Sequence, residues 1–377
     1  MVGRFLSVDL RRAARLAAMV AAVTLIAAAC QTTDNGGGGG GSSGGGDKTI
    51  ALLLPETKTA RYEAADRPLF EAKVKALCAD CKIIYSNADQ KADQQQNQAD
   101  AALTNGAKVM VLDPVDSASA GSIVSKAKAQ NVPVISYDRL ITNADVNYYI
   151  SFDNEKVGQL QGQALVEKLK KDGKSSGDIV MINGAPTDNN AKLFKQGAHS
   201  VLDSSGFKVG KEYDTPDWSP DKAQDEMEQA ITALSKNGFI GVYAANDGTA
   251  GGAIAAMKSQ GIKPADRPTT GQDAELAAIQ RILTGEQYMT VYKAIKPEAE
   301  QAAELAVNLV NGNTSAADGL ATAKVNNGTK DVASILLTPV AVTKDNIKDT
   351  IIKDNFHPVD QICSGAAASA CQAAGIS

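Results

Sequence analysis

Polar side chains stand at the ends of several short apolar segments, and they have the clearest capacity for chemistry in this chain. Each segment has the length of a buried strand and runs directly into charged or amide side chains. The polar ends are Tyr137-Asp138-Arg139, Asn183-Gly184, Asn246-Asp247, Gln272-Asp273 and Tyr292-Lys293. Because open parallel sheets bind ligands beyond the carboxyl ends of their strands, these ends could converge on one site. Strand ends also turn into loops that are polar anyway, so each end taken alone is weak support.

The composition argues against several classes of chemistry. The chain of 377 residues has two histidines, His199 and His357, which leaves little scope for histidine catalysis or a His-rich metal site. It has no G-x-x-x-x-G-K-[ST] phosphate loop, and the glycines of residues 246–252 do not form G-x-G-x-x-G. The formal net charge of −5 argues against a nucleic-acid partner bound through a basic surface. We therefore expect no metal, no cofactor and no nucleic acid.

The elements that must position the polar ends alternate between strand and helix. Apolar runs that predict buried strands are separated by segments with helical periodicity. The predicted strands are Ile50–Leu54, Ile83–Tyr85, Val109–Leu112, Val132–Tyr137, Ile179–Ile182, Phe239–Ala244 and Met289–Tyr292. The predicted helices cover roughly residues 59–78, 92–105, 117–130, 154–171, 188–203, 221–236, 249–260, 274–284 and 297–311. This pattern predicts an α/β protein with two doubly wound, parallel-sheet lobes, because one sheet of so many strands would be unusual.

Residues 1–29 are typical of an export signal and are set aside from the fold. Four arginines precede Leu16–Ala29, an apolar run of 14 residues that is too short to span a bilayer. The run ends in Ala27-Ala28-Ala29-Cys30, which resembles the lipobox of bacterial lipoproteins, with Ala27 where leucine is usual. We predict that Cys30 is lipidated and anchors the exported protein to the outer face of the cytoplasmic membrane, at the cell surface or in the periplasm. The alternative is an ordinary signal peptide with a chance cysteine.

Residues 30–47 are predicted to form a tether. Nine of the eleven residues Gly36–Gly46 are glycine and the other two are serine, so this segment cannot bury apolar area. A Gly-rich coil of this length spans roughly 20–25 Å. Removal of residues 1–29 takes away four arginines and one aspartate, which changes the formal net charge from −5 to −8.

The remaining four cysteines form two local pairs, Cys78 with Cys81 and Cys363 with Cys371. An exported protein meets an oxidising environment, so two structural disulfides are the favoured interpretation. The alternatives are a redox C-x-x-C at Cys78 and Cys81, or half of a zinc site. A second C-x-x-C is missing, and this motif ends a predicted helix, whereas reactive cysteines favour helix starts.

Several longer stretches resemble one known family. The resemblance is to the periplasmic-type sugar-binding proteins of ABC importers, and within them to D-xylose-binding members, from about Lys48 to His357. It is carried by Ser136–Arg139, Tyr149–Gly158, Asp188–Phe194, Asn246–Gly252, Gly271–Ala274 and Met289–Lys293. The tether and the residues beyond Pro358, with their cysteine pair, depart from the family pattern.

The resemblance implies the type I periplasmic-binding-protein fold, in which two lobes are joined by three hinge crossings. Carried over to this chain, the first lobe comprises 48–150 plus 294–336, and the second comprises 151–293 plus 337–362, followed by a C-terminal tail, 363–377. The crossings are expected near Ile150–Phe152, Lys293–Ala294 and Leu336–Thr338. The sugar would lie in the cleft between the lobes, which would close on it.

The residue types suit a sugar, which presents a ring of hydroxyls and apolar C–H faces. Carboxylates accept hydrogen bonds from hydroxyls, cations donate them, amides do both, and aromatic rings cover C–H faces. The predicted ligand-binding residues are Arg61, Tyr62, Asp138, Arg139, Asn189, Asn190, Trp218, Asn246, Asp273 and Lys293, with Lys58 a weaker candidate. Trp218, the only tryptophan, lies in Pro216–Pro220, a loop-like setting that favours stacking on a ligand over a role in the core.

We therefore expect a monomeric, lipid-anchored receptor that captures a monosaccharide, which the resemblance implies is D-xylose, and delivers it to an ABC importer without catalysing a reaction. The first alternative is a sensor that presents its closed state to a receptor kinase. A secreted glycoside hydrolase is a second, because pairs of carboxylates are present. A repressor with this ligand-binding fold is a third, but a signal sequence and a tether occupy the place of its DNA-binding helices.

Overall fold

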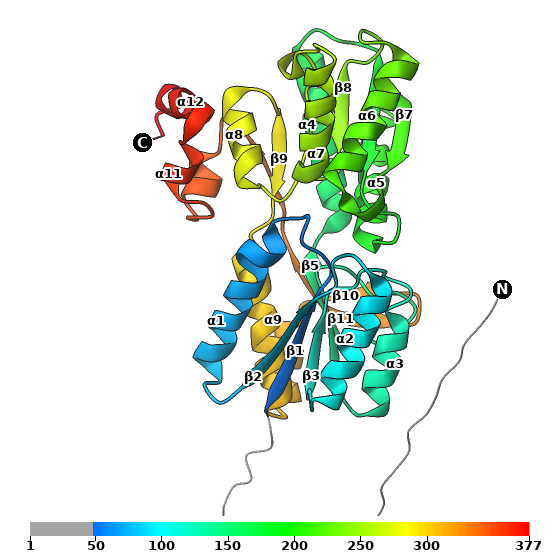
Figure 1. Cartoon of the computed structure of the whole chain (residues 1–377), viewed down its shortest axis with the longest axis vertical. Helices are drawn as coiled ribbons and strands as arrows, with labels where there is room; N and C mark the ends of the chain where they lie inside the picture. Colours follow the sequence, from blue (N-terminus) through cyan, green and yellow to red (C-terminus); the bar gives the residue numbers. More distant parts are fainter. Residues whose placement is uncertain (1–47, 377) are drawn as a thin grey trace, which may run out of the picture. The chain divides into compact units, whose positions relative to one another are not determined.

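The computed structural model describes residues 48–376, whose elements form two groups, each built on its own sheet system (Figure 1). The group drawn in the lower half of Figure 1, here called the first lobe, contains a seven-stranded sheet in the order β10-β11-β5-β4-β3-β1-β2. Its strands are β1 (Thr49–Leu54), β2 (Lys82–Asn87), β3 (Val109–Leu112), β4 (Val134–Tyr137), β5 (Tyr148–Phe152), β10 (Ala323–Asn326) and β11 (Asp331–Leu337). All neighbours pair in parallel except β10 with β11.

Helices cover both faces of this sheet, which explains why β1 is a continuous apolar run. Alternate residues of a strand point to opposite faces. Ile50, Leu52 and Leu54 pack in one core with the helices on one face, whereas Ala51 and Leu53 pack in the other core. The first face carries α1 (Arg67–Leu77), α9 (Ile295–Val310) and α10 (Thr314–Leu320), and the second carries α2 (Ala92–Thr104) and α3 (Gly121–Ala129).

The second lobe is drawn in the upper half of Figure 1 and repeats this plan. It has a parallel sheet in the order β7-β6-β8 and an antiparallel pair, β9 with β12. Isolated parallel bridges, Val242 to Thr269 and Gln272 to Val291, link these two sheets. The strands are β6 (Asp178–Asn183), β7 (Lys208–Asp214), β8 (Gly241–Ala244), β9 (Met289–Tyr292) and β12 (Val340–Thr343). The helices α4 (Asn154–Lys171) and α5 (Asn189–Leu202) cover one face, and α6 (Pro220–Leu234) and α7 (Asp247–Ser259) cover the other.

The chain passes between the two lobes at three places. Strand β5 pairs within the first lobe, and α4, which follows it, packs in the second. Strand β9 belongs to the second lobe and is followed by α9 of the first. Strand β11 pairs with β5, and β12, two residues later, pairs with β9.

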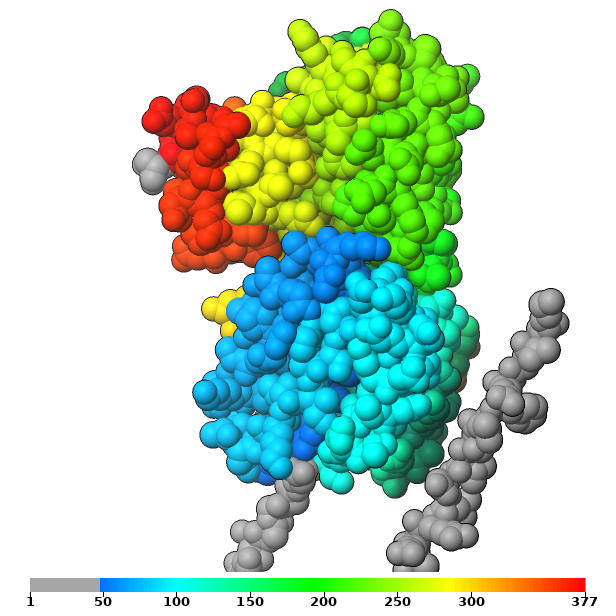
Figure 2. Space-filling view, viewed as in Figure 1, coloured from blue at the N-terminus to red at the C-terminus, as the bar shows by residue number. Residues whose placement is uncertain are grey.

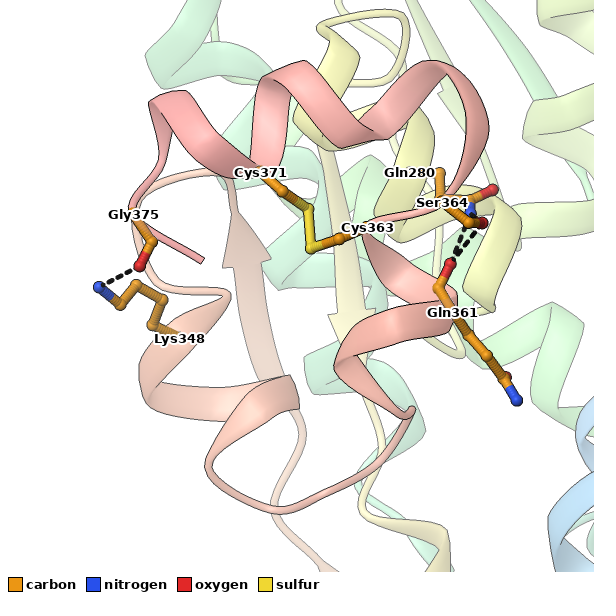
Figure 3. Close-up of a disulfide and its surroundings, with 7 residues drawn as sticks. All are labelled: Gln280, Lys348, Gln361, Cys363, Ser364, Cys371 and Gly375. Atoms are coloured by element: carbon orange, nitrogen blue, oxygen red, sulfur yellow. Dashed lines mark hydrogen bonds between the residues drawn. A yellow bond between two sulfur atoms is a disulfide. The ribbon is translucent and has the colours of Figure 1, made fainter. Parts of the chain in front are cut away.

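The C-terminal residues pack on the outer side of the second lobe. The π-helix at Lys348–Ile352, α11 (Val359–Ile362) and α12 (Ala368–Ala373) bury Ile351, Ile362 and Cys371 in one core with α8 (Leu276–Thr284). A disulfide joins Cys363 to Cys371 within this segment (Figure 3), and a second disulfide joins Cys78 to Cys81 after α1.

Most predicted elements occur, several of them with shifted ends. The helix expected over 59–78 is split into a π-helical turn, Tyr62–Asp66, and α1. The helix expected from residue 274 begins at Leu276, because Asp273 and Ala274 have positive φ angles. Strands β5, β7 and β10 to β12 were not among the predicted strands; β7, for example, is a half-buried edge strand rich in charge. Cys30 and the tether lie outside the described residues.

Candidate binding site

Four of the five polar strand ends meet at a cavity of about 270 Å³ between the two lobes, whereas Asn183 lies outside its wall and donates to Glu212 and Asp214. Its wall is formed by side chains that are almost fully buried, with contributions from both lobes. The residues are Thr59, Arg61, Tyr62, Asp138, Arg139, Asp188, Asn190, Phe194, Trp218, Asn246, Gln272, Asp273 and Lys293. In the space-filling view the blue N-terminal part of the first lobe touches the green and yellow surface of the second (Figure 2). The cavity therefore lies inside a closed arrangement of the lobes.

Asp138 is the central acceptor on the first-lobe side of the cavity. It follows β4 with a φ angle of 52°, which turns the chain sharply at the strand end. The hydroxyl of Tyr62 donates to its Oδ2 at 2.8 Å, and Nη1 of Arg61 lies 3.5 Å from its Oδ1. Burial opposes ionisation of Asp138, but the positive charges of Arg61, Lys293 and Arg139 outweigh it and lower its pKa to about 2. This carboxylate is therefore ionised and can accept hydrogen bonds from a ligand.

Arg61 is fixed by acidic residues on the side away from the cavity. Its Nη2 lies 2.6 Å from Oδ1 of Asp66, its Nε donates to Oδ2 of the same residue at 2.9 Å, and it also contacts Glu298. Burial, together with repulsion from Asp138 and Asp66, raises the pKa of Glu298 to about 8 despite the nearby Arg61. Three carboxyl groups thus surround one guanidinium, and Glu298 is the one that holds its proton near neutral pH.

Arg139, which is part of the cavity wall, joins the two lobes. Its Nε lies 3.1 Å from Oδ2 of Asp188 in the second lobe, and its Nη2 lies 3.6 Å from Oε1 of Glu56 in the first. Nearby, the Asn190 amide donates to the Asp138 carbonyl at 2.9 Å, which also crosses between the lobes. These bonds hold the closed arrangement and align polar groups of both lobes around the cavity.

Asp273 and Lys293 form an ion pair in the second-lobe wall. Oδ1 of Asp273 lies 2.9 Å from Nζ of Lys293, and both side chains are buried. Burial disfavours the charged amine, but Asp273 and Asp138 more than compensate and raise the pKa of Lys293. The pair presents an acceptor and a donor side by side, which matches a sugar hydroxyl. Gln272 lies beside them, and its buried Oε1 has no hydrogen-bond partner within the described residues.

Trp218 and Phe194 supply the apolar part of the wall. The two rings meet edge to face, with centroids 6.3 Å apart. The indole Nε1 donates to Oδ2 of Asp188 at 3.1 Å, the same oxygen that faces Arg139. Gly184 makes room for the ring, because a Cβ added there would lie 2.0 Å from Cη2 of Trp218. An aromatic surface next to fixed polar groups suits the C–H face of a small polar ligand.

The cavity brings together nine of the ten residues predicted to bind ligand, all except Asn189. Asn189 precedes Asn190 on α5, so its side chain points elsewhere on the helix, and its backbone N–H donates to Ser117 of the first lobe at 3.0 Å. Lys58, the weaker candidate, is exposed and lies outside the wall. The wall also contains Thr59, Asp188, Phe194 and Gln272, which were not among the predicted ligand-binding residues, although Gln272 belongs to one of the predicted polar strand ends. Phe194 could have been found, since it lies one turn after Asn190 on the same helix.

A family comparison matches residues 50–314, most of the described chain, to the periplasmic binding protein domain. The chain belongs to the periplasmic binding protein family. It is 41% identical over 317 residues to the D-xylose-binding periplasmic protein of Escherichia coli K12, an alignment that covers 83% of this chain and 92% of the relative. The D-xylose-binding periplasmic protein of Haemophilus influenzae is 40% identical over 320 residues, which is 84% of this chain and 92% of the relative.

Solved structures of this family share the fold of this periplasmic binding protein. An ABC transporter solute-binding protein from Clostridium phytofermentans with bound β-D-glucose has a TM-score of 0.75 and 28% identity. It is matched over 84% of this chain and 100% of its own. A carbohydrate transporter solute-binding protein from Chloroflexus aurantiacus, in complex with D-glucose, also has a TM-score of 0.75 and 28% identity, over 83% of this chain and 97% of its own.

Within residues 48–376, no group of three or more histidine, cysteine or acidic side chains is arranged to hold a metal ion. In that same part of the chain, every helix is too short or too polar to cross a bilayer. The cavity itself offers fixed hydrogen-bond donors and acceptors and an aromatic face, an arrangement that serves for binding.

Proposed function

We propose that this protein is an exported receptor that encloses one monosaccharide, D-xylose, between its lobes and delivers it to an ABC importer. The observation that carries the proposal is the closed, polar cavity of about 270 Å³ to which both lobes contribute donors and acceptors. A few fixed polar groups that converge beside an aromatic face are typical of a site for one small polar ligand such as a single sugar ring.

The choice of D-xylose rests on the relatives and on the chemistry of the wall. The two relatives at 41% and 40% identity are described as D-xylose-binding proteins. Asp138, Asp273 and Asn190 can accept from sugar hydroxyls, while Arg61 and Lys293 can donate to them. Trp218 would lie against a C–H face of the ring. A site built around hydroxyl partners rejects analogues that leave its buried polar groups unpaired.

The proposed mechanism is closure of the lobes around the three connections that follow β5, β9 and β11. A sugar held by Asp138 on one side and by Asp273 and Lys293 on the other bridges both lobes. It therefore stabilises the closed state relative to the open one, in proportion to the contacts that only the closed state makes. The Arg139–Asp188 and Asn190–Asp138 contacts also cross between the lobes and add to closure. The closed form is what the permease would receive.

We further propose that Cys30 carries the lipid that anchors the exported protein to the membrane. The support is the run of small residues before this cysteine. Metabolic labelling with a fatty acid analogue should mark the wild-type protein and fail to mark a Cys30→Ala variant, which would appear in the soluble fraction. Equal labelling of both proteins would refute the assignment.

A thermal-shift panel of pentoses and hexoses tests the proposed ligand. A ligand present at 1,000 times its Kd stabilises the folded state by about 4 kcal/mol. D-xylose should raise the melting temperature most, and Asp138→Asn should reduce the shift. A larger shift with glucose or ribose would contradict D-xylose as the ligand, and no shift with any sugar would contradict the receptor function itself.

A further inference from the structure

The backbone that presents Asp273 to the cavity is held in an unfavourable conformation. Asp273 has a φ angle of 89° and Ala274 has a φ angle of 52°, and neither residue is glycine. Left-handed conformations of such residues cost about 1–3 kcal/mol each and persist only where surrounding contacts enforce them. Two contacts come from β9: the Asp273 N–H donates to the Val291 carbonyl at 2.9 Å, and the Ala274 N–H donates to Oγ1 of Thr290 at 3.2 Å.

A third contact comes from the C-terminal segment. Nε2 of His357 lies 2.8 Å from the carbonyl oxygen of Ala274. A carbonyl oxygen only accepts, so Nε2 carries the hydrogen and donates it. Burial lowers the pKa of His357, which keeps the ring neutral near pH 7. This bond fixes the peptide that follows Ala274, the residue next to Asp273, whose carboxylate pairs with Lys293.

The ring of Phe356, next to His357, packs beside Tyr292, the residue that precedes Lys293. Phe356 meets His357 edge to face at 4.7 Å and meets Tyr292 at 5.0 Å between centroids. Tyr292 is the last residue of β9 and directly precedes Lys293. The C-terminal segment therefore contacts the neighbour of each member of the ion pair: the carbonyl of Ala274, next to Asp273, and the ring of Tyr292, next to Lys293.

The segment is itself fastened to the second lobe. Beyond His357, the disulfide Cys363–Cys371 closes a loop, and the Gln280 side chain of α8 donates to the Gln361 carbonyl at 2.9 Å (Figure 3). Helix α8 begins two residues after Ala274. These links therefore hold His357 next to the turn at Asp273.

We propose that His357 is a positioning residue for sugar binding: through the Ala274 carbonyl it holds the Asp273–Ala274 turn, and so aims the Asp273 carboxylate at the ligand. The inference rests on the proposed function, since it assigns His357 to the same cavity. His357 itself lies outside the cavity wall and makes its contribution through Asp273.

Calorimetric titration of the exported protein with D-xylose tests this role. A neutral hydrogen bond contributes about 1 kcal/mol, so His357→Ala should raise Kd about fivefold. His357→Gln keeps an N–H donor and should restore most of the affinity. Lys348→Met removes another hydrogen bond of the same segment, to Gly375, and should leave Kd unchanged. Equal Kd values for wild type and His357→Ala would overturn the proposal, and so would equal weakening by alanine and glutamine.

A double-mutant cycle separates positioning from general loss of structure. Asp273→Gly removes the carboxylate and accommodates the positive φ angle. In that background, His357→Ala should have no further effect on Kd, because the side chain that it positions is absent. A further fivefold loss there would show that His357 acts by another route. If the wild-type protein itself bound no monosaccharide, the proposed function would fail, whereas a sugar-binding wild type with an unaffected His357→Ala variant would refute only this inference.

Discussion

Gly184→Ala is the sharpest test of the aromatic wall, because it perturbs the cavity without altering any polar group. The added Cβ would lie 2.0 Å from Cη2 and 2.3 Å from Cζ2 of Trp218. Non-bonded carbons prefer about 3.5–4.0 Å, so the indole must move by roughly 1.5 Å. The φ angle of Gly184 is not positive, so the substitution introduces no strain of that kind.

The expected loss of affinity follows from what that movement disrupts. It stretches the Trp218–Asp188 hydrogen bond of 3.1 Å and withdraws the ring from the ligand. A lost hydrogen bond of about 1 kcal/mol and a lost aromatic contact of about 0.5–1.5 kcal/mol correspond to a rise in Kd of about 10- to 70-fold. Overpacking should also destabilise the protein by about 1–3 kcal/mol.

Intrinsic fluorescence provides the assay, because Trp218 is the only tryptophan and lies in the cavity wall. Sugar titration of the wild type should change its emission, and the variant should show a shifted spectrum and a weaker titration. Gly319→Ala is the matched control, since Gly319 lies in α10 and an added Cβ there would meet nothing within 4 Å. Wild-type affinity and an unchanged emission spectrum in Gly184→Ala would refute the account of the wall.

Three further outcomes are expected. Trp218→Ala should weaken sugar binding at least tenfold (about 1.4 kcal/mol) without unfolding the protein, and unchanged affinity by calorimetry would exclude its contact with the ligand. The pKa of Glu298 is raised by burial to about 8, from an ordinary value near 4.5, so the folded state binds this proton more tightly than the unfolded state. Its contribution to stability is therefore lost as pH rises from about 4.5 to 8, and Glu298→Gln should flatten the decline of melting temperature over that range; parallel pH profiles would contradict this. The disulfide Cys363–Cys371 closes a longer loop than Cys78–Cys81, so its reduction should lower the free energy of unfolding by more, about 2.5 kcal/mol against about 2 kcal/mol. Chemical denaturation of matched serine variants should show that order.

The sequence predicts strands best where both faces of the strand are buried. Strand β3 was predicted with its observed ends because helices cover both faces of the sheet, so every residue from Val109 to Leu112 is apolar. Strand β7 was missed because it lies at an edge, where half-exposed lysine and glutamate side chains mask the pattern. The hydrophobic pattern therefore predicts the central strands of a sheet better than its edge strands.

The polar strand ends predicted the cavity. They did not predict the wall residues that lie elsewhere in the sequence and also have an ordinary local role. Asp188 caps α5 by accepting from the Asn190 N–H at 2.8 Å, an ordinary local role. Its second oxygen serves Trp218 and Arg139, which are distant in sequence and can only be related to it by the folded chain. Phe194 was missed because its side chain also packs in the core of the second lobe, and the sequence does not distinguish an aromatic residue of the core from one that lines a cavity.

The direction of β1 has a practical consequence for attaching this protein to a surface. The strands of the first lobe that run parallel to β1 point their carboxyl ends at the cavity, so Thr49, at the amino end, lies at the opposite edge of the sheet, about 20 Å away along a six-residue strand. A support or fluorophore coupled ahead of Thr49 would leave the closing surfaces free. Coupling through the C-terminal end would instead attach the support to the segment that holds the turn at Asp273. A sugar sensor built from this chain should therefore be immobilised by its amino end.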